Sequence, residues 1–155
     1  MLNVKNAEIA DLEQIMKIYR YAQDYMIKSG NPTQWGHFYP DADLIKSDID
    51  KNACKVIYDK DGIHGVFALF DTYKHIEGGN WLNEEPYLTI HRLAGDGQVH
   101  GLFPCALNYC KKISLNIRVD THADNKTMQR LIEKNGFIKC GTIYVKNGTA
   151  RIAKD

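Results

Sequence analysis

A glycine-containing turn in the second half of the chain has the composition of a phosphate-binding site. Gly95, Gly97 and Gly101 follow residues 87–93, a stretch of aromatic and branched residues that is typical of a β-strand. Pro104 comes next, in what we expect to be the first turn of a helix, where its missing N–H costs nothing. A strand, a glycine turn and a helix in this order direct free backbone N–H groups at a phosphate. The sequence therefore predicts that this turn binds a phosphate group.

The spacing of the glycines narrows the choice of phosphate ligand. A Walker-type loop requires Gly-Lys-Ser or Gly-Lys-Thr at the helix start, and the sequence has neither. The Gly-x-Gly-x-x-Gly turn of a Rossmann-type nucleotide-binding domain is one residue shorter than the spacing of Gly95, Gly97 and Gly101. Asp120, at the end of the next expected strand, stands where a ribose-binding acid would, but too few residues follow for a second mononucleotide-binding half. A Rossmann-type domain therefore stays as the less favoured alternative.

Two segments of the second half resemble motifs of one known family. Residues 98–103, Gln-Val-His-Gly-Leu-Phe, resemble the Gln/Arg-x-x-Gly-x-Gly/Ala loop with which GNAT-type N-acetyltransferases bind the pyrophosphate of acetyl-coenzyme A. Residues 125–137 resemble the family's Asn-x-x-Ala-x-x-Leu-Tyr-x-Lys-x-Gly-Phe segment. Phe103, Met128 and Ile132 depart from these patterns, in place of a small residue, an alanine and a tyrosine. Two motifs in the family's order, with one strand between them, are more specific than either alone.

The resemblance implies a fold and a cofactor site. The fold is an α+β (α/β) GNAT fold in a single domain, residues 1–155, with a mixed, mostly antiparallel sheet that splays between its fourth and fifth strands and about four flanking helices. Acetyl-coenzyme A lies in that splay as co-substrate. Backbone N–H groups of the glycine turn hold its pyrophosphate, and backbone groups near residues 91–93 pair with pantetheine and polarise the thioester carbonyl. The implied cofactor residues are Leu93, Gln98, Val99, His100, Gly101, Leu102, Phe103 and Asn125.

Acetyl transfer to an amine also requires a general base. Histone-type members of the family carry a glutamate on the fourth strand, and residues 87–93 contain no carboxylate. His91 is the one group on this strand that titrates near neutrality, and side-chain alternation places it on the same face as Leu93. His122, three residues before Asn125, is the second candidate base. For each histidine, a structural or surface role is the more common one.

The acid and the acceptor pocket are less defined by the sequence. Ile132 replaces the tyrosine that the family often uses to protonate the thiolate, so Tyr144, Cys140 or water is the candidate acid. Trp35 and Tyr39, in an aromatic loop before a proline, could line the pocket for a primary amine of a small molecule, an amino acid or a peptide. Packing of these rings on the first helix is an equal expectation. The departures at Phe103 and Ile132 also leave open a non-catalytic acyl-coenzyme A-binding module.

Composition supports an ordinary globular domain. The chain has 155 residues, 44% of them hydrophobic and 25% charged, with a formal net charge of +1. That charge gives no reason to expect a nucleic acid or a membrane surface as partner, and no apolar run is long enough to span a bilayer. The four cysteines show no paired spacing and the six histidines no metal-ligand spacing, so we expect a cytoplasmic protein without a metal site. The oligomeric state is left open, with a homodimer among the options.

Local signals predict where the elements begin and end. Asn6 and Asp41 are expected to cap the first two helices. Residues 59–62, Asp-Lys-Asp-Gly, are expected to join two strands as a tight turn. Residues 125–135 are expected to form a helix, and Asn147-Gly148 to join strands 138–145 and 149–153 in a closing hairpin.

Overall fold

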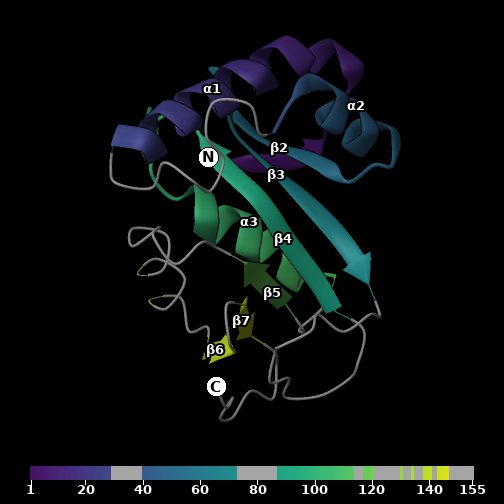
Figure 1. Ribbon diagram of the computed structural model, residues 1–155, viewed down its shortest axis with the longest axis vertical. Helices are drawn as coiled ribbons and strands as arrows, with labels where there is room; N and C mark the ends of the chain where they lie inside the picture. The colour runs from purple at the N-terminus through teal and green to yellow at the C-terminus, as the bar shows by residue number, and fades with distance from the viewer. Residues whose placement is uncertain are drawn as a thin grey trace.

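The computed structural model describes residues 1–28, 40–72, 87–113, 117–120, 130, 134, 138–140 and 143–146 (Figure 1). Its elements in chain order are β1 (Asn3–Asn6), a 3₁₀ turn (Ile9–Asp11), α1 (Leu12–Lys28), α2 (Ala42–Asp50), β2 (Cys54–Asp59), β3 (Gly62–Thr72), β4 (Tyr87–Gly95), α3 (Leu102–Lys111), β5 (Ile117–Asp120), β6 (Ile138–Cys140) and β7 (Ile143–Lys146). Of the helix expected at residues 125–135, Arg130 and Lys134 are described, and both are helical.

The strands form one mixed sheet in the order β1-β2-β3-β4-β5-β7-β6. Among the described strands, β4 and β5 pair in parallel and every other neighbouring pair is antiparallel. This topology confirms the expected mixed, mostly antiparallel sheet. It contradicts the Rossmann-type alternative, because a doubly wound domain is built on a mostly parallel sheet.

Helices cover both faces of the sheet, so its central strands are apolar on both sides. Figure 1 shows α1 and α2 on one face and α3 on the other. On β2, Val56 packs into the core beneath α1 and α2, whereas its neighbour Ile57 packs into the core beneath α3. Strand alternation is the cause, since successive side chains point to opposite faces.

Helix α1 is amphipathic and lies along the sheet. Ile15, Ile18 and Tyr19 are buried on its inner side, while Tyr21 and Tyr25 are about half exposed, at 48% and 51%. No helix in the described part of the chain is long and apolar enough to cross a membrane.

The two expected helix caps have different outcomes. Asp41 caps α2 as expected, with its Oδ1 accepting the N–H of Leu44 at 2.9 Å. The cap expected at Asn6 is wrong, because Asn6 is the last residue of β1 and its Oδ1 accepts from the Lys55 ammonium group. The carbonyl of Asn52 is the second acceptor of that group, at 3.0 Å, and burial lowers the pKa of Lys55. Asn6 therefore satisfies a buried cation instead of a helix end.

The two expected hairpins also differ in outcome. Strands β2 and β3 pair through residues 59–62 as expected, with Asp59 opposite Gly62. The closing hairpin lies earlier than expected, because Ile138–Cys140 and Ile143–Lys146 pair with Cys140 opposite Ile143. Asn147-Gly148 and the strand expected at residues 149–153 lie outside the residues that the structure describes.

Phe103 supports the core beneath α3, where it is 1% exposed. Phe103→Ala should therefore lower the free energy of unfolding by about 3–5 kcal/mol, the usual loss when a buried aromatic ring is truncated. Urea unfolding measures this loss, and His100→Ala, at an exposed position nearby, is the control that should leave stability nearly unchanged. A Phe103→Ala protein as stable as the wild type would contradict this packing.

Candidate functional site

Strands β4 and β5 pair at one end and then part. Their parallel pairing joins Leu88, Thr89 and Ile90 of β4 to residues 117–119 of β5. Beyond Ile90, β4 continues for five more residues, to Gly95, without a β5 partner among the described residues. Figure 1 shows the short β5 beside part of the much longer β4. Among the described residues, the sheet edge of β4 after Ile90 is therefore open on the side of β5, as expected for the splay that the resemblance implies.

A β-bulge interrupts β4 where this open edge begins. On β3, Val66 lies opposite Ala94 and Ala68 lies opposite His91, so β4 holds one residue more than β3 between these pairs. Within the bulge, Arg92 has a φ of 53°, in the left-handed region. Bulges twist a strand and redirect its polar groups, and a non-glycine residue in this region is uncommon.

Both helices of one face hold the bulge in place. The hydroxyl of Tyr19 on α1 donates to the carbonyl of Arg92 at 2.8 Å. Nη2 of Arg92 donates to Oδ2 of Asp48 on α2, a carboxylate that is only 2% exposed. The guanidinium group also lies over the ring of Phe70, 5.7 Å from its centroid. Because these contacts fix both the backbone and the side chain of Arg92, the strained conformation persists.

The bulge changes which way the candidate base points. His91 lies opposite Ala68 and contacts Phe70 edge-on, with ring centroids 5.6 Å apart, on the face covered by α1 and α2. Leu93 packs against the core beneath α3, on the other face. The expectation that His91 and Leu93 share a face is wrong, because the extra residue at Arg92 breaks the alternation. His91 is half-buried.

The glycine turn has the geometry of an anion site. Gly101 is the N-cap of α3 with a φ of 87°, and no side chain caps the helix there. A Cβ placed on Gly101 would meet nothing within 4 Å, so the space before the helix is open. Within the described residues, the N–H groups of His100, Gly101 and Leu102 donate no hydrogen bond to another part of the fold, as expected for the free amides of a helix start. Such a terminus attracts negative charge.

Two residues of this turn behave differently from the expectation. The N–H of Gln98 donates to Oδ1 of Asp96 at 2.9 Å, so this amide is already engaged within the turn. The side chain of Phe103 points into the core, which explains in packing terms why a large residue replaces the family's small one. Val99 is half-buried, whereas His100 is exposed. The Leu102 side chain lies so close to Gly95 that a Cβ there would stand 2.4 Å from its Cδ1.

A histidine that the motifs do not include lies beside this turn. Nδ1 of His64 is 2.9 Å from Oδ2 of Asp96, and Nε2 is 2.8 Å from Oδ1 of Asp59. The hydrogen bond to Asp96 and then that to Asp59 raise the pKa of His64, against the effect of burial. The N–H of Asp61 and then the His64 ring lower the pKa of Asp59. Sequence patterns gave no signal for this cluster, because its members are brought together by the pairing of β3 with both β2 and β4.

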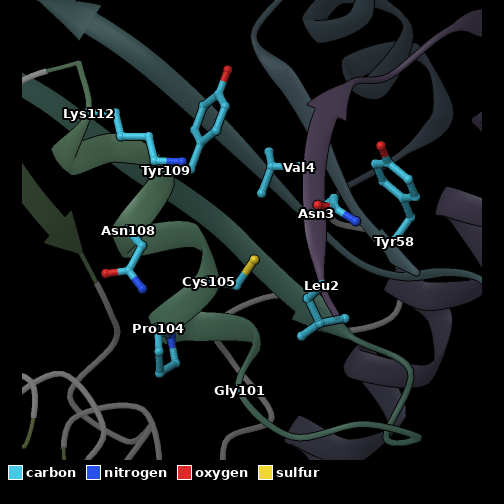
Figure 2. Close-up of a pocket in the computed structure, with 10 residues that line it drawn as sticks. All are labelled: Leu2, Asn3, Val4, Tyr58, Gly101, Pro104, Cys105, Asn108, Tyr109 and Lys112. Atoms are coloured by element: carbon cyan, nitrogen blue, oxygen red, sulfur yellow. The ribbon is translucent and has the colours of Figure 1, made fainter. Parts of the chain in front are cut away.

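A separate hollow of about 620 Å³ lies between α3 and β1 (Figure 2). Its size is in the range of small-ligand pockets. It is lined by Leu2, Asn3, Val4, Tyr58, Gly101, Pro104, Cys105, Asn108, Tyr109 and Lys112. The hollow meets the glycine turn at Gly101 and contains none of the candidate catalytic residues.

Of the remaining candidate residues, the structure describes Tyr144 but not the other four. Tyr144 lies in β7 opposite Val119 of β5, which places its backbone next to the parallel pair at the base of the splay. Trp35, Tyr39, His122 and Asn125 lie outside the residues that the structure describes. Their expected roles stay predictions.

Comparison with known proteins identifies this architecture. No family model and no curated protein matches the chain. A GNAT-family acetyltransferase from Streptococcus agalactiae is 26% identical with a TM-score of 0.85, over 96% of each chain. A GNAT-family acetyltransferase from Listeria monocytogenes is 18% identical with a TM-score of 0.70, over 94% of this chain and 92% of that one. A Bacillus subtilis N-acetyltransferase, solved in complex with coenzyme A, is 15% identical with a TM-score of 0.61, over 95% of this chain and 97% of that one.

These matches confirm the resemblance to the GNAT-type acetyltransferases and the fold that it implies. The last two share the fold alone at their level of identity. Together with the open edge of β4, the matches support acyl transfer as the class of activity.

The His64 cluster should make folding stability depend on pH. The raised pKa of His64 means that its contribution is complete below about pH 6.5 and is lost as the pH rises through the folded-state pKa. The lowered pKa of Asp59 means that its contribution is lost as the pH falls through that pKa. The difference in unfolding free energy between wild type and His64→Gln, measured with urea, should therefore shrink from about pH 6 to about pH 9. A difference that stays constant over this range would show that the charge of His64 contributes nothing.

Proposed function

We propose that this chain, whose fold is that of the GNAT-type acetyltransferases, moves an acetyl group from acetyl-coenzyme A to a primary amine. The acceptor is a small molecule, an amino acid or a peptide, and its amine attacks the thioester directly in a ternary complex. The supporting observation is that the open edge of β4 and the uncapped start of α3 follow one another along the chain. A thioester on the former and a pyrophosphate on the latter are the two ends of one extended cofactor. We expect this chemistry in the cytoplasm.

The pyrophosphate end is assigned to the turn before α3. The N–H groups of Val99, His100, Gly101 and Leu102 would bind the phosphate oxygens, and the open space beside Gly101 fits such a group. Gln98 would contribute its side chain, because its N–H is held by Asp96. Phe103 would contribute only backbone, since its ring is buried. Asn125 keeps its proposed contact with the cofactor.

The acyl end is assigned to the bulge of β4. Backbone N–H groups on its open edge, from His91 to Leu93, would pair with the pantetheine arm and polarise the thioester carbonyl. Rigid donors are effective because they need not reorganise as negative charge develops on the oxygen. The contacts of Tyr19 and Asp48 with Arg92 supply that rigidity.

Proton transfer completes the reaction. His91 would take a proton from the acceptor ammonium group, directly or through one water, and the free amine would then attack the carbonyl carbon. The carbon–sulfur bond breaks, and the thiolate receives a proton from Tyr144 or water. His122 is the second candidate base. Trp35 and Tyr39 are proposed to line the acceptor pocket.

A non-catalytic acyl-coenzyme A-binding module is the second candidate function. Ile132, at the position of the family's acid, favours it. Phe103 no longer does, because its departure is explained by core packing. Release of free thiol from acetyl-coenzyme A with a panel of amines separates the two functions, since a binding module releases none.

Acetyl-coenzyme A should raise the melting temperature. A ligand that binds only the folded protein adds about 2.7 kcal/mol at a hundredfold excess over its Kd. Gly101→Asp should lose this shift, because its carboxylate would stand at the anion site, whereas Gly101→Asn is the matched control for backbone strain at the φ of 87°. Thermal unfolding with coenzyme A, acetyl-coenzyme A and NAD measures the effect. If only NAD moved the melting curve, the proposed function would be wrong.

His91→Gln should lower kcat by about 10²-fold with little change in the affinity for acetyl-coenzyme A, because a general base acts on the acceptor proton. His122→Gln should cost less. Steady-state kinetics across pH measures both effects. A His91→Gln enzyme with wild-type kcat and an unchanged pH–rate profile would remove His91 from the mechanism.

A further inference from the structure

The His64 ring is placed between two carboxylates at the end of the sheet where α3 begins. Asp59 comes from the last position of β2, and Asp96 is the first residue after β4. The three side chains are largely buried, at 11%, 17% and 19% exposure for His64, Asp59 and Asp96. Each ring nitrogen lies within hydrogen-bond distance of a carboxylate oxygen.

This geometry requires a protonated ring. An ionised carboxylate only accepts hydrogen bonds, and a neutral imidazole donates from one nitrogen while the other carries a lone pair. A neutral His64 would therefore face one carboxylate with a lone pair at 2.8–2.9 Å. Only the imidazolium form donates to Asp59 and Asp96 together.

Asp96 transmits the state of the ring to the glycine turn. Its Oδ2 faces His64, and its Oδ1 accepts the N–H of Gln98, so one carboxylate joins the cluster to the turn. The N–H of Asp96 also donates to the carbonyl of His64 at 2.9 Å. Gly97, with a φ of 76°, packs so closely under Tyr21 of α1 that a Cβ would lie 2.3 Å from its hydroxyl. The turn is thus held at Asp96 by hydrogen bonds and at Gly97 by close packing against Tyr21.

The protonation state of His64 sets the net charge beside the glycine turn, and an anionic ligand there would respond to that charge. With His64 protonated, the three groups carry a net charge of −1, and with His64 neutral they carry −2. The added negative charge would lie beside the turn assigned to the pyrophosphate, and one of the two carboxylates would lose its hydrogen bond from the ring.

We propose that His64 is a positioning residue for the cofactor, whose protonated ring neutralises and orients Asp96 and so makes coenzyme A affinity decrease as the pH rises. This inference rests on the proposed function, because it needs the diphosphate at the glycine turn. The hydrogen bond to Asp96 and then that to Asp59 raise the pKa of His64 above its ordinary value.

The effect of His64 on cofactor affinity must be distinguished from the effects of other titratable groups near the turn. Asp59 and Asp96 are the charged groups that act on the ring, and Lys60 and Asp61 of the connecting turn are exposed. His100 lies in the glycine turn itself and is exposed, so its imidazole ring would act on the same ligand. The 3′-phosphate of coenzyme A also titrates near pH 6. The test therefore uses 3′-dephospho-coenzyme A and a His100→Gln background.

Calorimetric titration of 3′-dephospho-coenzyme A into His100→Gln should show Kd rising about three- to tenfold between about pH 6 and about pH 9, the size expected for one nearby charge. His100→Gln/His64→Gln should bind at the weaker level throughout, with a flat pH profile. His100→Gln/His64→Lys, which keeps the positive charge, should restore affinity at the alkaline end. Circular dichroism confirms that each variant is folded.

Equal pH profiles with and without His64 would overturn the inference while leaving the proposed function in place. A ligand that fails to bind His100→Gln and wild type at any pH would overturn both. Weaker binding of the His64→Gln variant by the same factor at every pH would also overturn it, since a purely structural role predicts that result.

Discussion

The left-handed backbone of Arg92 is the constraint on which the rest of the candidate site depends. A residue other than glycine pays of order 1–2 kcal/mol for this conformation, so it persists only where neighbouring contacts enforce it. Here Tyr19 of α1 holds the carbonyl and Asp48 of α2 holds the guanidinium group. Both helices therefore contribute to the acyl end of the site, although neither is proposed to contribute a reacting group there.

Because of the bulge at Arg92, one face of β4 packs into the core and the other face carries the candidate base. Ile90 and Leu93 turn into the core beneath α3, which anchors the strand. His91 lies on the face of α1 and α2, beside Phe70. A strict alternation would have placed His91 and Leu93 together, so the inserted residue is what makes a polar group available on one face while an apolar group secures the other.

The sequence predicted the fold well because its signals there are local. The aromatic and branched run of β4, the turn at residues 59–62 and the cap at Asp41 each specify structure within a few residues. The errors arose where distant residues compete. Asn6 binds Lys55, which lies 49 positions away, and the single strand expected at residues 138–145 is two strands, because β7 pairs with both β5 and β6. The bulge and the His64 cluster were missed for the same reason, since Tyr19–Arg92 and His64–Asp96 are contacts that only the folded sheet creates. The turn at residues 98–103 was predicted because it matches a family motif. That motif does not predict that the Phe103 side chain packs into the core or that the N–H of Gln98 donates to Asp96.

The central claim is that one extended cofactor spans the turn before α3 and the open edge of β4. Backbone amide NMR shifts on titration with coenzyme A test it most directly, because most of the proposed contacts are made by backbone N–H groups. The account predicts that the largest shifts fall on His100, Gly101 and Leu102 and on the bulge at His91 to Leu93. Shifts confined to the hollow between α3 and β1, on Asn3, Val4, Asn108, Tyr109 and Lys112 (Figure 2), would contradict it.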